Sequence, residues 1–388
     1  MVAIRIITVG VSTLKIRAAI LERMGLEGPY AESKPLQVQE IELGQPGPGE
    51  VLIKMAAAGI CHSDLSIIEG VRPRPLPMVI GHEAAGVVTA VGPYVDDLVP
   101  GDHVVTVFVA ACGHCPECSG GRPALCGPGA VAGTKGTLLR GDRRLMRQDE
   151  YLNHHSGISA FAEYAVVSAR SLVKVDKEIP LAHAALFGCA VLTGVGAATN
   201  TASISLGSTV AIVGMGGVGL AAQLGALAAG ASDVIAIDTN EHKLAFAKEL
   251  GARHVFHAAD PHLVEAIRDL THGGVDVALE FAGAASALET AWKVGRRGGE
   301  VVTAGLARPD ATFAVPMVGL VAEERTLKGS YMGSSVPSRD LPRYLELFLR
   351  GRLPIDKLVT HTLPLDDINL GMDRLKNGEA VRQVVTFD

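Results

Sequence analysis

Four cysteines in one short segment form the densest group of metal-ligating side chains in this sequence. They follow the pattern C-x2-C-x2-C-x7-C at Cys112, Cys115, Cys118 and Cys126. Such spacings let one loop wrap around a tetrahedral zinc ion, and four thiolates leave no open position for a substrate. The pattern therefore predicts a structural zinc site, with the thiols preferred over the nearby His114 as ligands. The alternative is a loop of free thiols.

A second set of potential metal ligands is spread along the chain. It comprises Cys61 at the start of the segment Cys61–Asp64, the pair His82 and Glu83, and the distant Cys189. Two thiolates and one imidazole, with a fourth position open, would suit a catalytic zinc. Spacing alone does not pair ligands so far apart, and a buried cysteine or a core histidine is the commoner role of each. From the residues alone, both interpretations stay open.

A glycine-rich turn lies between an apolar segment, Val210–Val213, and a helical pattern of small residues, Leu220–Ala229. Its G-x-G-x-x-G positions are Gly214, Gly216 and Gly219, with Gly217 and Val218 between them. Such glycines allow close approach of the backbone to a pyrophosphate at a helix N-terminus. Asp238, nineteen residues after the last glycine, can accept hydrogen bonds from the adenosine ribose. We therefore predict dinucleotide binding, with NAD favoured over NADP because a 2′-phosphate would face a carboxylate. A purely structural turn is the alternative.

The spacing of apolar residues predicts two kinds of architecture along the chain. Short strand patterns broken by Gly and Pro indicate an all-β, barrel-like region, with strands at Lys15–Leu21, Leu36–Leu43, Val51–Gly59, Gly86–Val91, His103–Phe108, Phe161–Val167 and Leu172–Val175. Alternating strands and helices then predict a doubly wound parallel α/β sheet, with strands at Val210–Val213, Val234–Asp238, His254–His257, Val275–Phe281, Glu300–Ala304 and Thr326–Tyr331.

These patterns predict a division into domains. We expect a catalytic domain over residues 15–189 that carries the zinc loop, and an NAD-binding domain over 190–331. Residues 332–388 contain helical stretches and a final strand, and we expect them to return to the first domain. Residues 1–14 are interpreted as an N-terminal extension, and the polar segment Lys135–Glu150 as an exposed excursion.

Composition excludes several classes of function. The 388 residues carry a net charge of −6 with interspersed charges, which is no electrostatic footprint for nucleic acid. Two apolar stretches, Ala184–Ala198 and Thr209–Ala231, are too short or too rich in glycine to span a membrane. We find no signal-peptide pattern, and clustered cysteines are typical of metal binding rather than disulfides. We therefore expect a cytoplasmic protein with no membrane partner.

Several motifs together resemble the zinc-dependent medium-chain alcohol dehydrogenases, in the longer, liver-type branch. They are Gly81-His82-Glu83-x2-Gly86-x5-Gly92-x2-Val95, Cys61-His62-Ser63-Asp64, the four-cysteine loop, Gly188-Cys189 and the glycine-rich turn. The resemblance runs from about Lys15 to the C-terminus. It implies a Rossmann domain beside a GroES-like β-barrel catalytic domain, two zinc ions per chain, NAD, and a homo-oligomer, with a dimer favoured over a tetramer.

The same resemblance implies roles for single residues near the catalytic zinc. Its ligands would be Cys61, His82 and Cys189, with Glu83 as an alternative ligand and Asp64 orienting the imidazole of His82. Ser63 would be the hydroxyl that relays the proton, and Phe108 a wall of the substrate pocket. Related polyol dehydrogenases have Glu where this chain has Cys189, which favours the alcohol branch.

Around the cofactor, the resemblance adds Lys243 at the ribose, and His62 and Arg382 at the pyrophosphate. Ordinary structural interpretations remain for four residues: a solvated carboxylate for Asp64, a loop histidine for His62, a solvated lysine for Lys243 and a core side chain for Phe108. Family members often end the proton relay in a histidine where this chain has Ser66, so the proton could leave through Ser66, water or His62.

The implied activity is reversible oxidation of primary (including allylic and benzylic) or secondary alcohols to aldehydes or ketones, with hydride transfer to NAD. Two alternatives remain. One is glutathione-dependent formaldehyde dehydrogenase, although the segment Glu69–Pro77, with Arg72 and Arg74, shows no clear match to its glutathione-binding pattern. The other is a zinc-free relative, similar to quinone reductases or purely structural.

Overall fold

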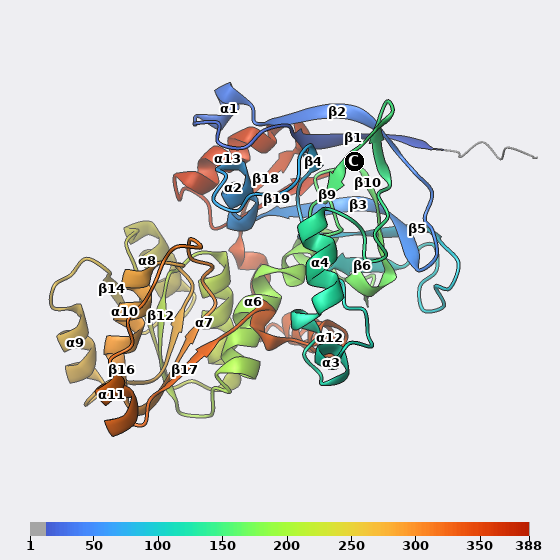
Figure 1. The fold of residues 1–388 in the computed structure, drawn as a ribbon. Helices are drawn as coiled ribbons and strands as arrows, with labels where there is room; N and C mark the ends of the chain where they lie inside the picture. The colour runs from blue at the N-terminus through green and yellow to red at the C-terminus, as the bar shows by residue number, and fades with distance from the viewer. Residues whose placement is uncertain (1–12, 388) are drawn as a thin grey trace, which may run out of the picture.

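A computed structural model describes residues 13–387 of the chain. The predicted extension over residues 1–14 therefore lies almost entirely outside the described residues. Figure 1 shows a β-rich lobe, blue and green at the top, and an α/β lobe, yellow and orange at the lower left, with helix α6 (Ala190–Gly196) between them.

The β-rich lobe contains two sheets. The first has the order β8-β7-β2-β1-β4-β9, and the second the order β11-β6-β5-β3-β19-β18 with β10 paired to β3. The strands are β1 (Leu14–Leu21), β2 (Leu36–Leu43), β3 (Glu50–Ile60), β4 (Met78–Val79), β5 (Ala84–Val91), β6 (His103–Thr106), β7 (Leu145–Arg147), β8 (Glu150–Tyr151), β9 (Asn153–His154), β10 (Tyr164–Ser168), β11 (Leu172–Val175), β18 (Val359–Pro364) and β19 (Arg382–Thr386). These sheets confirm the predicted barrel-like fold.

The α/β lobe contains one sheet of parallel strands in the order β14-β13-β12-β15-β16-β17. The strands are β12 (Thr209–Val213), β13 (Asp233–Asp238), β14 (His254–His257), β15 (Val275–Glu280), β16 (Gly295–Thr303) and β17 (Thr326–Gly329). The helices of this lobe are α7 (Gly217–Ala229), α8 (Glu241–Glu249), α9 (Leu263–Leu270), α10 (Ala285–Val294) and α11 (Met317–Ala322). This confirms the predicted doubly wound fold. Strand order reverses at β12, and ligands of such sheets bind at the carboxyl ends of the strands beside that point.

The central strands of this sheet are apolar on both faces. Val210, Ala211 and Ile212 in β12 are fully buried, as are Val234, Ile235, Ala236 and Ile237 in β13. Strands of a parallel sheet are apolar along their whole length in this way when helices cover both faces of the sheet.

The remaining helices belong to the β-rich lobe and to the region between the lobes. They are α1 (Tyr30–Ser33), α2 (His62–Ile68), α3 (Pro116–Ser119), α4 (Gly127–Lys135), α5 (Leu181–Ala184), α6, α12 (Pro337–Leu349) and α13 (Ile368–Lys376). After β17 the chain leaves the α/β sheet, and its last strand, β19, pairs antiparallel with β3. The Asp373 carboxylate of α13 accepts hydrogen bonds from the amides of Tyr30 and Ala31 in α1, which fastens this C-terminal segment to the β-rich lobe.

The expectation that Lys135–Glu150 is an exposed excursion is partly wrong. Leu138 and Leu145 are 1% exposed, and they pack with residues of β1 in one apolar cluster. Strand β7 pairs with β2, and the Arg144 guanidinium pairs with Glu50. The segment is polar overall, which led to the wrong expectation, but its two leucines pack against the first sheet.

No single helix among residues 13–387 has the length and apolar composition needed to cross a bilayer. One bent pair, Leu181–Gly188 and Ala190–Thr201, meets that test only when its two parts are taken together.

His154 is a fully buried histidine in β9, the edge strand of the first sheet. Its Nε2 accepts a hydrogen bond from the amide of Arg144 at 3.1 Å, and its Nδ1 lies 3.4 Å from the Ser159 hydroxyl. Burial lowers the pKa of His154 to about 3, and the charges of Arg143 and Arg144 act in the same direction.

This histidine should make the fold sensitive to acid. As the pH falls below the ordinary pKa of about 6.5, His154 becomes protonated in the unfolded chain. In the folded protein it stays neutral until about pH 3. Stability is therefore lost across that window, by about 2 kcal/mol at pH 5. His154→Gln keeps an acceptor for the Arg144 amide and has no titrating group. We expect the variant to lose about 2 kcal/mol less stability than the wild type between pH 7 and pH 5, measured by guanidinium denaturation. Equal losses in the two proteins would contradict this assignment.

Candidate functional site

The fold brings Cys61, His82, Glu83 and Cys189 into one buried group whose potential ligand atoms lie within 4.8 Å of one another. Cys61 caps the N-terminus of α2, and Cys189 precedes α6. His82 and Glu83 end the loop before β5. The distance from Cys189 Sγ to His82 Nε2 is 3.5 Å, close to the edge of about 3.6 Å that a tetrahedral zinc with these two ligands would have. The donor set and its geometry fit a zinc ion.

The Asp64 carboxylate orients two members of this group. One of its oxygens lies 3.0 Å from Nδ1 of His82, and the other accepts the amide hydrogen of Cys61 at 3.0 Å. With its proton on Nδ1, the imidazole directs the lone pair of Nε2 toward Cys189. Asp64 is 0% exposed, so it is not a solvated loop carboxylate. Burial raises the pKa of Asp64, but the contacts with His82 and His155 outweigh it and hold this pKa well below its usual range.

The two thiols of the group favour a bound cation. A hydrogen bond between them lowers the pKa of Cys61 and raises that of Cys189. The thiolate is therefore more stable at Cys61, where His82 and Arg382 add positive charge. A buried anion needs such compensation, and a divalent metal ion would provide more of it.

Glu83 and Arg382 form a fully buried ion pair behind these ligands. Burial raises the pKa of Glu83 to about 7, although the charge of Arg382 lowers it. Its second oxygen, Oε1, is buried without a hydrogen-bond partner in the described structure. This free oxygen suits the role of an alternative metal ligand. Arg382 also borders the glycine-rich turn, because a Cβ at Gly217 would lie 2.2 Å from its Cδ.

The glycine-rich turn has two glycines with different environments. A Cβ at Gly219 would lie 1.9 Å from the carbonyl oxygen of Gly214, whereas a Cβ at Gly216 would meet nothing within 4 Å. Gly219 therefore serves the packing of α7 against β12, and Gly216 borders open space at the helix N-terminus. At the end of β13, the carboxylate of Asp238 accepts the amides of Met215 and Asn240 at 2.6 and 2.9 Å. These features form a cradle that fits a dinucleotide pyrophosphate.

The other residues singled out from the sequence lie around these two places. Ser63 is half-buried in the first turn of α2, and His62 is exposed at its start. The Ser66 hydroxyl donates to the carbonyl of His62 at 3.0 Å, which ties it to its own helix. Lys243, in the first turn of α8, extends toward Gly378. The Phe108 ring lies 5.8 Å from the rings of both His82 and Tyr331, which places it as a wall beside the metal group.

The four-cysteine loop forms a second metal group, with its sulfur atoms within 4.8 Å of one another. The Cys115 and Cys126 sulfurs are 3.9 Å apart, close to the edge of about 3.8 Å in a tetrahedral zinc–thiolate site. The amides of Cys112 and Gly129 donate to Cys126 Sγ, and the Cys115 amide donates to Cys112 Sγ. His114 is exposed and hydrogen-bonded to the Cys112 carbonyl, so it stands apart from the group. The loop fits a closed zinc site.

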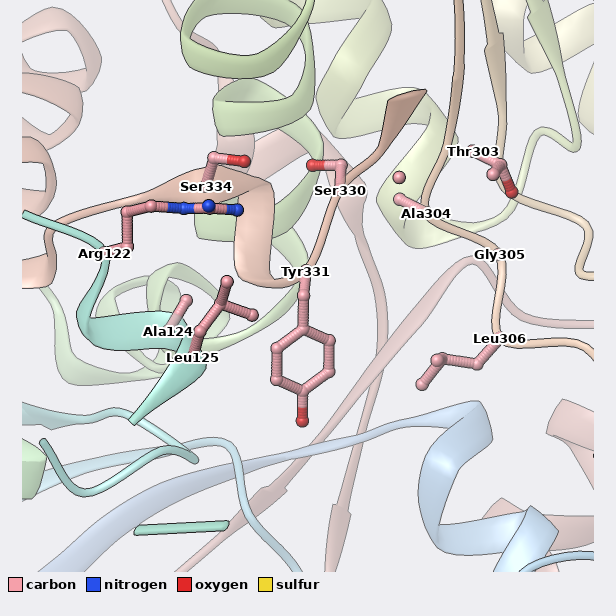
Figure 2. A pocket seen from close by; sticks show the side chains of 11 residues that line it. Arg122, Ala124, Leu125, Thr303, Ala304, Gly305, Leu306, Ser330, Tyr331 and Ser334 are labelled. Carbon is pink, nitrogen blue, oxygen red and sulfur yellow. The ribbon is translucent and has the colours of Figure 1, made fainter. Parts of the chain in front are cut away.

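Two residues near the metal group were not found from the sequence. His155 is buried with Nδ1 at 3.3 Å from an Asp64 oxygen, and its ring lies 5.0 Å from that of His82. Tyr331 lines a cavity of about 320 Å³ between the zinc loop and the ends of β16 and β17. Figure 2 shows Leu125 and Arg122 on one side of Tyr331 and Leu306 on the other. Neither residue belongs to a motif, so no local pattern marks it.

Comparisons with known proteins agree with this geometry. Residues 47–177 match the family model of the alcohol dehydrogenase GroES-like domain, and residues 217–350 match that of the zinc-binding dehydrogenases. Alcohol dehydrogenase 1 of Pisum sativum is 35% identical over 98% of this chain and 99% of its own length.

Two solved structures are also similar. Benzyl alcohol dehydrogenase from Acinetobacter calcoaceticus is 32% identical with a TM-score of 0.90, and the match covers 97% of this chain and 100% of that one. A zinc-binding dehydrogenase from Sinorhizobium meliloti, bound to NADP, is 27% identical with a TM-score of 0.79, over 96% and 100% of the two chains. With both family models and these relatives matched along its length, the chain belongs to the zinc-dependent, medium-chain alcohol dehydrogenase family, and it is an oxidoreductase that acts on alcohols.

Proposed function

We propose that this enzyme oxidises primary or secondary alcohols reversibly to aldehydes or ketones with NAD, using one catalytic and one structural zinc ion per chain. The observation that carries the proposal is the buried group of Cys61, His82 and Cys189, which offers three ligands for one metal ion. The Phe108 ring packs beside His82 and forms a wall next to this group. The substrate binds beside this group, on the side of the cavity that Tyr331 lines. We place the protein in the liver-type branch.

The chain's own residues position the reactants. Asp64 holds the imidazole of His82 and the backbone of Cys61, and Phe108 limits where the substrate carbon lies. Ser63, at the first turn of α2, accepts the proton that leaves the alcohol. Zinc supplies a Lewis acid and NAD a hydride acceptor when they are bound. Exit of the proton through His62 or water is favoured over Ser66, whose hydroxyl donates to a backbone carbonyl.

NAD is favoured over NADP by Asp238 at the end of β13. Its carboxylate would repel a 2′-phosphate, whereas it accepts hydrogen bonds from ribose hydroxyls. The similar dehydrogenase from Sinorhizobium meliloti was solved with NADP, so the assay that tests the proposal compares both cofactors. Reduction of NAD by at least one alcohol class, without added glutathione, is the expected result.

The domain division given above, a dimeric assembly and a cytoplasmic location stay predictions.

Metal content separates the two zinc sites. We expect about two zinc ions per chain by elemental analysis. His82→Ala should retain one zinc and lose turnover while it still binds NAD, because the cofactor cradle does not include this imidazole. Cys115→Ser should lose the other zinc and lower the thermal midpoint, since a structural zinc contributes to folding stability. Normal turnover in His82→Ala, or a single zinc in the wild type, would contradict the proposal.

Asp64→Asn tests the orientation of the imidazole. The variant keeps the size of the side chain and loses the charge that both His82 and Cys61 contact. Substitutions at such supporting positions typically weaken metal affinity about 10- to 100-fold. We expect that loss at the catalytic site, measured by competition with a chelator, and no loss at the four-cysteine loop. Unchanged affinity would show that the ligands hold their geometry without Asp64.

Gly216→Ala and Gly219→Ala form a matched pair at the cofactor turn. Gly216 borders open space, so its added methyl group should leave the thermal midpoint near that of the wild type. The same methyl group should occupy the place of the pyrophosphate and weaken NADH binding by about tenfold or more, an effect of about 1.4 kcal/mol. Gly219→Ala should instead destabilise the fold, because its methyl group meets the Gly214 carbonyl. Fluorescence titration and thermal unfolding measure both effects, and unimpaired NADH binding in Gly216→Ala would refute the proposed cradle.

A further inference from the structure

Arg72 extends from the β-rich lobe across to the wall of the cavity that contains Tyr331. It lies in the segment that follows α2, and its side chain is half-buried. One guanidinium nitrogen, Nη2, donates to the carbonyl of Leu306, which lines the cavity, and to that of Ala307 at 3.2 Å. Nε and Nη1 have no hydrogen-bond partner in the described structure, so three of the five N–H groups of this side chain are free to bind a ligand.

The surroundings of the cavity are cationic, and no carboxylate among the described residues lines it. Arg72 and its neighbour Arg74 make no ion pair within residues 13–387, and Arg74 donates only to the carbonyl of Pro73. The cavity is lined by Arg122 and by no aspartate or glutamate. Burial lowers the pKa of Arg72 and the nearby charge of Arg74 lowers it further, whereas Tyr331 and Cys61 act in the opposite direction. A half-buried cation held beside another cation gains from an anionic partner.

Two aromatic rings in contact connect the wall of the cavity with the metal group. Tyr331 lines the cavity and contacts Phe108, and Phe108 contacts His82, each at 5.8 Å between ring centroids. Burial raises the pKa of Tyr331, and the charges of Arg74 and Arg72 act on it in the opposite direction. Arg72 and Arg74 lie near enough to Tyr331 for their charges to act on it, and Arg72 contacts Leu306 of the cavity wall. A molecule whose hydroxyl lies at the metal group and whose chain passes Phe108 and Tyr331 therefore extends toward the arginines.

We propose that the physiological substrate is an alcohol with an anionic group, a carboxylate or a phosphate, at the end remote from its hydroxyl. Arg72 binds that group through its free N–H groups, and Arg74 adds to the attraction. The inference rests on the proposed function, because it names the substrate class of the same site. A charge-assisted hydrogen bond from the free Nη1 or Nε of Arg72 would also hold the remote end of the substrate in place.

The test compares alcohols of equal length that differ in their remote group. We would measure kcat/KM with NAD for hexanol, 6-hydroxyhexanoate, 6-hydroxyhexyl phosphate and 6-aminohexanol, and for the four- and eight-carbon series. In the wild type we expect kcat/KM for an anionic substrate to exceed that for its neutral partner by about tenfold or more at one chain length, and the amine to be the poorest. The better of carboxylate and phosphate identifies the group.

Variants separate the charge of Arg72 from its contact with the Leu306 carbonyl. Arg72→Gln keeps hydrogen-bond donors and removes the charge, and we expect it to lower the anionic-to-neutral ratio by about tenfold. Arg350→Leu removes a paired arginine from the end of α12 and should leave the ratio unchanged. A second measurement is calorimetric titration of the NADH-loaded enzyme with hexanoate, which should bind about tenfold more weakly to Arg72→Gln.

Contrary results have distinct meanings. If the wild type shows no preference for anionic substrates, or if Arg72→Gln lowers kcat/KM equally for neutral and anionic partners, Arg72 only connects the two lobes and the inference is overturned. If no alcohol reduces NAD, the proposed function fails. In that case the inference about an alcohol substrate fails with it, and the hexanoate titration separately shows whether Arg72 binds a carboxylate: weaker binding by Arg72→Gln means that it does, and equal affinity that it does not.

Discussion

The buried ion pair between Arg382 and Glu83 joins parts of the molecule that are far apart in sequence. Arg382 belongs to the last strand, Glu83 to the loop that carries His82, and Gly217 of the cofactor turn packs against the arginine's Cδ. Removing either charge would leave the other buried and unpaired, which costs several kcal/mol. The pair therefore constrains the C-terminal strand, the metal group and the dinucleotide turn to one arrangement, and hydride transfer between two bound partners requires such a fixed arrangement.

The site lies at the junction of the two lobes because each lobe supplies different residues to it. The parallel sheet supplies the turn at the end of β12 and the acidic residue at the end of β13. The β-rich lobe supplies Cys61 and His82, and the segment between the lobes supplies Cys189. The cavity that Tyr331 lines lies between the zinc loop of the β-rich lobe and the ends of β16 and β17 of the α/β lobe. Arg122, Ser330 and Tyr331 of its lining lie in loops, which can vary without disturbing either sheet.

Much of the secondary structure could be predicted from local patterns. Leu36–Leu43, Leu172–Val175 and His254–His257 form strands with the expected bounds. These segments have apolar patterns bounded by turn residues, so local signals and tertiary packing agree. The expectation for Lys135–Glu150 was partly wrong for the opposite reason: its two buried leucines lie in a largely polar segment, and two positions are too few to establish a period. Short helices such as α2 and α4 also escaped notice, since they are too short to show a period.

The sequence by itself determined the features whose geometry is local. Four thiols within one loop can meet around a single ion, and a glycine turn between a strand and a helix presents amides at that helix's N-terminus, whatever surrounds them. Only the tertiary structure decided that Cys61, His82 and Cys189 meet, that His155 lies against Asp64, and that Arg72 reaches the wall of the cavity. These contacts join residues separated by tens to hundreds of positions, and their closeness depends on strand register and on how the two lobes pack. No spacing along the chain encodes that information.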